Sequence, residues 1–157
     1  LISTCLFGDG AAAAVWSGAG GDWQVGNFES IHQPEHREKI RFTNAGGKLR
    51  NQLHKSVPVH VAEAVSLLYE KRKGEPQAWI THGGGRDVIE QLERVLPCEE
   101  LTYARDVMRD YGNLSSPSVL VALEKFLEEA DGSEDRLWVC AFGAGFSAHS
   151  CEMTKVN

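Results

Sequence analysis

The apolar residues of this chain recur at helical spacing in three stretches. The first follows Ser56, the second spans 87–96 and stops at Pro97, and the third begins at Pro117 after a Ser116 cap. Each has apolar residues three and four positions apart, which predicts an amphipathic helix. The residues predicted to face inward are Val61, Ala64, Val65, Leu68, Val88, Ile89, Leu92, Val95, Leu96, Val119, Leu120, Leu123, Phe126 and Leu127.

Short extended segments alternate with these helices. Residues 78–80 and 137–142 are apolar enough for buried strands, and residues 146–153 predict a closing strand. At the start, residues 2–7 and 11–16 predict two strands on either side of a glycine turn at residues 8–10. Strands that alternate with helices predict an α/β protein with a layered sheet.

The remaining segments carry weaker patterns. Residues 17–27 are rich in glycine and predict a surface loop, whereas residues 28–50 are polar and poorly periodic. Asn44 to Lys48 carries two glycines and predicts the tip of a hairpin or loop. Residues 100–110 predict a short helix or an irregular approach to the segment that follows.

Composition narrows the class of protein. The chain has 157 residues, 42% of them apolar, which suits one domain with an ordinary core. The net charge of −6 comes from interspersed charges, so we expect no nucleic-acid partner. No apolar run is long enough to span a bilayer, and no signal peptide is visible, so we expect a cytoplasmic protein without membrane contact. Because the sequence opens on Leu1, we expect it to be part of a longer or processed polypeptide.

The four cysteines suggest neither a disulfide framework nor a metal site. Cys5, Cys98, Cys140 and Cys151 form no CxxC pair, and no Cys/His cluster has the spacing of a zinc site. We therefore expect reduced thiols, most of them buried, and no bound metal.

Two segments carry candidate chemistry. Residues 79–85 deliver His82 from an apolar strand onto three glycines, and residues 111–116 deliver Asn113 onto a turn before a helix. A histidine and an asparagine on adjacent strand ends would form two hydrogen-bond donors for a carbonyl or enolate oxygen. A lipase-type oxyanion loop would need a Gly-x-Ser-x-Gly elbow, which this sequence lacks. The other five histidines carry no such context.

Both ends of the chain contain a similar unit. Phe7-Gly8-Asp9-Gly10 and Phe142-Gly143-Ala144-Gly145 each follow an extended segment, which is weak internal symmetry. We expect residues 1–30 to close one repeat and residues 31–157 to form a second.

These segments together resemble a known family. Residues 7–13, 79–85, 111–116 and 142–145 occur in order and at suitable spacing, and the chain resembles the C-terminal half of a thiolase-fold condensing enzyme. The closest resemblance is to type III polyketide synthases of the chalcone synthase kind, with the ketoacyl-carrier-protein synthase III group next. The segment Lys55-x-Val57-Pro58 also fits the type III pattern.

The resemblance implies a layered α-β-α-β-α fold and a Cys-His-Asn site. His82 and Asn113 would hold a malonyl thioester carbonyl, assist decarboxylation and stabilise the enolate. His82 would also pair with the ionised cysteine. Phe7 would act as a gating aromatic, and Gly84 and Gly85 would lie along the pantetheine arm. The resemblance further implies substrate contacts at Ser115, Phe142 and Ala144.

The sequence also departs from the family pattern. The family's nucleophilic cysteine lies in the N-terminal half, and none of the four cysteines here falls at that position. Asn51 stands where plant enzymes usually have a bulky gating phenylalanine, which implies a wider or more polar pocket. Gly83 and Ala144 replace prolines common in plant sequences, which points to a microbial or divergent member.

The resemblance implies partners rather than cofactors. The cysteine-bearing N-terminal portion would complete the site, and such assemblies would dimerise. Coenzyme A or carrier-protein thioesters would serve as substrates, with no bound cofactor. Two alternatives stay open: a synthase III-like ketosynthase subunit, and a non-catalytic half that scaffolds an active neighbour.

Overall fold

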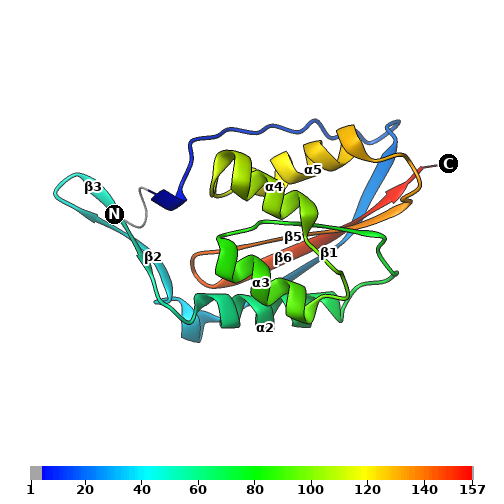
Figure 1. The fold of residues 1–157 in the computed structure, drawn as a ribbon. Coiled ribbons are helices and arrows are strands. Elements are labelled where there is room, and N and C mark those ends of the chain that lie inside the picture. Colours follow the sequence, from blue (N-terminus) through cyan, green and yellow to red (C-terminus); the bar gives the residue numbers. More distant parts are fainter. Residues whose placement is uncertain (1–4, 157) are drawn as a thin grey trace.

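The computed structural model describes residues 5–156, in which helices cover both faces of a four-stranded mixed sheet (Figure 1). The strand order is β1-β6-β5-β4, with β6 antiparallel to both of its neighbours and β4 parallel to β5. The elements are β1 (Trp23–His32), the 3-10 helix η1 (Pro34–His36), β2 (Ile40–Ala45), β3 (Lys48–Leu53), α2 (Val57–Tyr69), β4 (Ala78–Thr81), α3 (Arg86–Val95), α4 (Thr102–Tyr111), α5 (Pro117–Glu129), β5 (Arg136–Gly143) and β6 (Ser147–Lys155). This arrangement confirms the predicted α/β class.

Strand β5 divides the core into two layers. Successive side chains of a strand point to opposite faces. Trp138 and Cys140 pack with the residues of α2 and α3, whereas Leu137 packs with those of α5 and with Val107 of α4. In Figure 1 the helices α2 and α3 accordingly lie on one side of the sheet, and α4 and α5 on the other.

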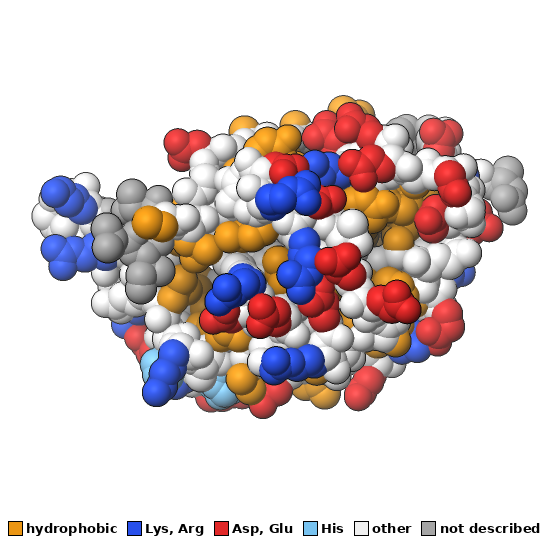
Figure 2. Space-filling view, in the orientation of Figure 1, with side chains coloured by type: hydrophobic (Ala, Val, Ile, Leu, Met, Phe, Trp, Pro, Cys, Tyr) orange, Lys and Arg blue, Asp and Glu red, His pale blue; other side chains and the backbone are white. Residues whose placement is uncertain are grey.

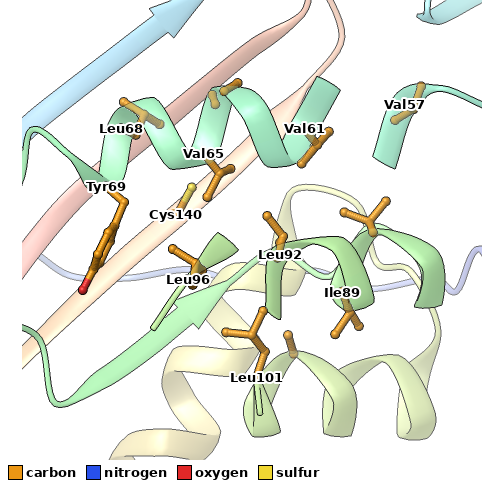
Figure 3. Packing of buried hydrophobic residues seen from close by; sticks show 14 of the residues in the cluster. Val57, Val61, Val65, Leu68, Tyr69, Ile89, Leu92, Leu96, Leu101 and Cys140 are labelled. Atoms are coloured by element: carbon orange, nitrogen blue, oxygen red, sulfur yellow. The ribbon is translucent and has the colours of Figure 1, made fainter. Parts of the chain in front are cut away.

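The apolar faces of the helices are largely as predicted. Figure 3 shows the side chains of α2 directed at the sheet and at α3, with Val65 close to Cys140. Two predicted core residues are wrong, because Val95 and Leu127 are 38% and 48% exposed. Both lie in the last turn of their helices.

Residues 17–53 hold more strand than the sequence predicts. β1 begins at Trp23, inside the predicted loop, and continues into the stretch expected to lack periodicity. Its pairing with β6, interrupted by a bulge between Gly26 and Glu29, stabilises this polar strand. The hairpin tip is confirmed: β2 and β3 pair up to Ala45 and Lys48, and the two glycines between them have positive φ, as a tight hairpin turn requires.

The two strands predicted at the start of the chain are wrong within the described residues. Residues 1–4 lie outside them; Cys5 and Leu6 are helical, and Phe7 makes only an isolated bridge. Residues 11–16 form no strand, and Val15 and Trp16 are 99% and 63% exposed. Across residues 5–156 this segment pairs with no strand, and an extended segment needs a neighbour to become one.

Strand β1 runs across the boundary expected between the two repeats, at residues 30 and 31. The division of the chain into two repeats stays a prediction. No helix within residues 5–156 is both long and apolar enough to cross a bilayer.

Candidate functional site

Strand β4 places His82 at the edge of the core. Ile80 and Thr81 are buried, and β4 pairs with β5 up to Thr81 and Cys140. The pairing continues one residue further through the backbone, because the His82 N–H donates to the Cys140 carbonyl at 3.0 Å. The histidine is therefore fixed by the sheet rather than by a free loop.

The glycine turn after His82 provides room for close packing. Gly84 has a φ of +68°, and a Cβ there would lie 2.9 Å from Cζ of Phe142. The Gly85 N–H donates to the Gly83 carbonyl at 2.8 Å, and α3 begins at the next residue. A side chain at Gly84 would be strained and would displace the aromatic ring.

His82 is a buried, neutral imidazole. Its ring lies 4.9 Å from that of Phe142, and only 9% of the residue is exposed. Burial lowers the pKa of His82 from 6.5 to about 4, because desolvation disfavours the charged ring. Its Nδ1 is buried without a hydrogen-bond partner among the described residues. At neutral pH the ring therefore has one N–H donor and one free acceptor nitrogen.

Asn113 is tied to the turn that follows His82. Its Nδ2 donates to the Gly84 carbonyl at 2.7 Å, and its Oδ1 accepts from the Ser115 N–H at 2.8 Å. The residue is 6% exposed. An amide nitrogen carries two hydrogens, so a second N–H remains after the bond to Gly84.

The sequence predicts that His82 and Asn113 lie on adjacent strand ends, and for Asn113 the structure differs. Asn113 follows helix α4 and the cap residue Gly112, so it does not end a regular strand. Its backbone instead forms a one-residue parallel bridge with Phe7. The Asn113 N–H donates to the Leu6 carbonyl at 2.8 Å, and the Gly8 N–H donates to the Asn113 carbonyl at 3.1 Å.

Most predicted site residues gather in this corner. In addition to His82 and Asn113, the contacts bring in Phe7, Gly84, Gly85, Ser115 and Phe142. Ser115 is exposed and has a φ of +62°.

Asn51 and Ala144 stand apart from this group. Asn51 lies on β3 in the separate hairpin, and Ala144 is exposed in the turn between β5 and β6. Among the described residues, no hydrogen bond or ring contact joins either one to His82 or Asn113.

Sequence reasoning missed two hydroxyl groups in the corner. Thr81 and Ser118 line a narrow space together with Asn113, and each hydroxyl is buried without a partner among residues 5–156. Only their positions in the sequence could have indicated them. Thr81 directly precedes the histidine, and Ser118 lies in the first turn of α5.

The cysteines are unpaired, as expected, and three of them are poor nucleophiles. Burial raises the pKa of Cys98 and that of Cys151 to about 11, and it raises the pKa of the fully buried Cys140 as well. A thiol is nucleophilic as its thiolate, so these environments disfavour attack. The prediction that most of the thiols are buried holds for Cys140 and in part for Cys98 and Cys151, whereas Cys5 is exposed.

Comparison with known proteins identifies this fold. The α/β fold matches the C-terminal part of type III polyketide synthases, which is thiolase-like. A solved structure of 1,3,6,8-tetrahydroxynaphthalene synthase from Streptomyces coelicolor A3(2) superposes with a TM-score of 0.85 and 28% sequence identity. The match covers 97% of this chain and 47% of that chain. A structure of CsyB complexed with CoA-SH shares the fold at a TM-score of 0.75 and 20% identity, over 85% of this chain and 41% of that chain.

The sequence comparison gives the family. Residues 34–156 match the family described as chalcone and stilbene synthases, C-terminal domain, and the chain belongs to it. Relatives include a putative chalcone synthase of Bacillus subtilis, 28% identical over 94% of this chain and 46% of its own length. Type III polyketide synthase 10 of Oryza sativa is 32% identical over 94% of this chain and 43% of its own length. The chain thus spans about half the length of these relatives.

Proposed function

We propose that this chain supplies the histidine and asparagine of a Cys-His-Asn site in a type III polyketide synthase. One observation carries the proposal: the Asn113 amide is hydrogen-bonded to the glycine turn directly after His82. Asn113, 31 positions after His82 in the sequence, is thus tied to the turn that follows the histidine, and both residues are buried in a chain that belongs to this family. The amide has a structural role in its bonds to Gly84 and Ser115, and its second N–H is left for a ligand.

The proposed reaction is a decarboxylative Claisen condensation. The bond between the carboxylate and the α-carbon of a malonyl thioester breaks, CO₂ leaves, and the electron pair moves to the thioester oxygen as an enolate. His82 and Asn113 donate to that oxygen, and one such donor typically contributes about 3–4 kcal/mol to transition-state stability. The enolate carbon then attacks the cysteine-bound acyl carbon, and the cysteine thiolate leaves.

The protonation state of His82 supports this donor role. A ring whose pKa is about 4 is neutral at pH 7 and donates through its single N–H. A thiolate brought close to this ring would favour the protonated form and raise the pKa. Ion pairing between His82 and the cysteine would therefore arise only on assembly with the segment that carries the cysteine.

The nucleophile is proposed to lie in an N-terminal portion of the enzyme. The raised pKa values of Cys98, Cys140 and Cys151 support this assignment. The exposed apolar residues Val15 and Trp16 also suit a segment that pairs with further strands. In this proposal residues 1–30 close the N-terminal repeat of a layered α-β-α-β-α fold, residues 31–157 form the second repeat, and the assembled enzyme dimerises in the cytoplasm.

The substrate is proposed to be an acyl or malonyl thioester of coenzyme A. The CoA-SH complex of CsyB supports this class of ligand for the fold. Gly84 and Gly85 would border the pantetheine arm, and Phe7 and Phe142 would face the acyl chain. The remaining proposed contacts are Asn51, Ser115 and Ala144.

The test uses the assembled protein, meaning this chain with the segment that carries the cysteine. We expect His82→Ala and Asn113→Ala each to reduce CO₂ release from malonyl-CoA by about 10²–10³-fold. His149→Ala, at an exposed histidine on β6, is the matched control and should leave the rate unchanged. Wild-type rates in both site variants would support a scaffold role instead. Activity with carrier-protein thioesters but not with coenzyme A thioesters would favour a synthase III-like ketosynthase.

A further inference from the structure

Four histidines away from His82 form two close pairs. His32 and His149 lie edge to face at 5.6 Å, whereas His36 and His60 are stacked with ring centroids 3.8 Å apart and planes inclined at 25°. The second pair is joined by Glu63. One ligand atom from each of His36, His60 and Glu63 lies within 4.8 Å of the others. Figure 2 shows histidine surface in pale blue at the lower left of the molecule, where α2 begins in Figure 1.

The backbone holds the two imidazoles in place. The Gln33 N–H donates to the Phe146 carbonyl at 2.8 Å, and the His36 N–H donates to the Gln33 carbonyl at 2.9 Å, so η1 is anchored to the β5–β6 turn. His60 projects from the first turns of α2. Both rings pack edge-on against Phe146, at 5.6 and 6.0 Å, and Phe146 is almost completely buried. The pair therefore sits on a rigid apolar base.

Glu63 supplies the third potential metal ligand. It lies three residues after His60, on the same face of α2, and its Oε2 is 3.1 Å from His60 Nδ1. Two imidazoles and one carboxylate are the protein ligands of many zinc sites that keep one position open for water. The His60 side chain is 20% exposed and that of Glu63 is 56% exposed, so an ion could enter from solvent.

An unpartnered acceptor belongs to a residue that lines the same surface hollow as Glu63. Gln33 Oε1 is buried and has no hydrogen-bond partner among the described residues. Gln33 and Glu63 line the same surface hollow of about 540 Å³ between α2 and α3. A water bound to a metal ion is a strong donor and would satisfy such an acceptor.

We propose that His36, His60 and Glu63 bind one divalent transition-metal ion of the zinc class, with water in the open position and Gln33 beside it. The two imidazole ligands favour Zn²⁺, Ni²⁺ or Cu²⁺ over Mg²⁺ or Ca²⁺. The ion joins η1 to α2, two segments that no regular strand pairing connects. The site shares no residue with the corner of His82 and Asn113, so it stabilises the fold without taking part in the condensation.

The test is a calorimetric titration of the metal-free chain with ZnCl₂, in a Cys5→Ser background that removes the exposed thiol. We expect one saturable equivalent, and a shift of thermal unfolding to higher temperature. His36→Asn and His60→Asn should each weaken binding by roughly tenfold or more. His54→Asn and His149→Asn alter exposed histidines outside the set and serve as matched controls that should bind as the parent does.

Two further measurements keep the result interpretable. Glu63→Gln changes a largely exposed side chain, so it tests the site even if a histidine variant fails to fold. Substituted Co²⁺ should show the visible absorption of nitrogen and oxygen ligands without a thiolate charge-transfer band. Absence of saturable Zn²⁺ binding would overturn the proposal, and so would unchanged affinity in both His60→Asn and Glu63→Gln.

Discussion

The stretches Ala78–Gly85 and Gly10–Trp16 look alike in the sequence, yet only the first contains a strand. Each contains a short apolar run, residues 78–80 in the first and residues 11–16 in the second, and each also contains glycine. The first pairs with β5 and packs against α5, and Ile80 within it is completely buried. The second has no paired neighbour among residues 5–156 and leaves Val15 almost fully exposed. A short apolar run therefore forms a strand only where a neighbouring strand pairs with it.

The largest expected difference between the two stretches is in stability. Ile80→Ala removes a fully buried side chain and should lower the free energy of unfolding by about 2–5 kcal/mol. Val15→Ala alters a side chain that touches solvent and should change it by less than about 0.5 kcal/mol. Urea unfolding of both variants measures the contrast. Similar losses in the two variants would mean that residues 10–16 are packed in this chain.

The next largest effect is the pH dependence of stability that the buried His82 contributes. Its pKa is about 4 in the folded chain and near 6.5 when unfolded, so the unfolded chain binds more protons between these values. Stability contributed by the neutral ring is complete above pH 6.5 and is lost as the pH falls towards 4. The total is on the order of 3 kcal/mol. Unfolding curves between pH 4 and 7 for the wild type and His82→Gln measure it, and equal pH dependence in both would contradict the burial argument.

A smaller effect tests how the N-terminal segment docks on the site. A Cβ at Gly8 would lie 2.0 Å from the Tyr111 carbonyl oxygen, so Gly8→Ala must push the segment away from Asn113. We expect a loss of roughly 1–3 kcal/mol of stability. Gly18 has no neighbour within 4 Å of an added Cβ, and Gly18→Ala is the matched control. Thermal unfolding compares them. An unchanged Gly8→Ala variant would show that the contact between residues 6–8 and Asn113 does not contribute.

The regular elements that the sequence predicts correctly carry their own signal. Helices α2, α3 and α5 have one apolar face and a defined start, and β4 and β5 are largely apolar. Strand β1 is missed because half of its residues are polar and interrupt the apolar pattern, and its pairing with β6 makes it extended. Residues 11–16 are predicted wrongly for the opposite reason, since their pattern suits a strand but no strand among residues 5–156 pairs with them.

Some residues of the candidate site can be predicted from the sequence, and others only from the fold. His82 and Asn113 stand out because glycines and a turn surround them, and their closeness follows from the bond to Gly84. The hydroxyls of Thr81 and Ser118 enter the corner only through the packing of α4 and α5 around it, which no local pattern encodes. The roles of Asn51 and Ala144 rest on resemblance, and they stay predictions.

Complementation tests whether His82 and Asn113 complete a site with the cysteine of another segment. Purified chain is mixed with a separately produced N-terminal portion that carries the nucleophilic cysteine, and malonyl-CoA decarboxylation and product formation are followed. We expect activity in the mixture, none in either polypeptide by itself, and loss of activity when the added chain carries His82→Ala or Asn113→Ala. Equal activity with the wild-type chain and the double variant would contradict it, because the two donors would then have no part in the reaction.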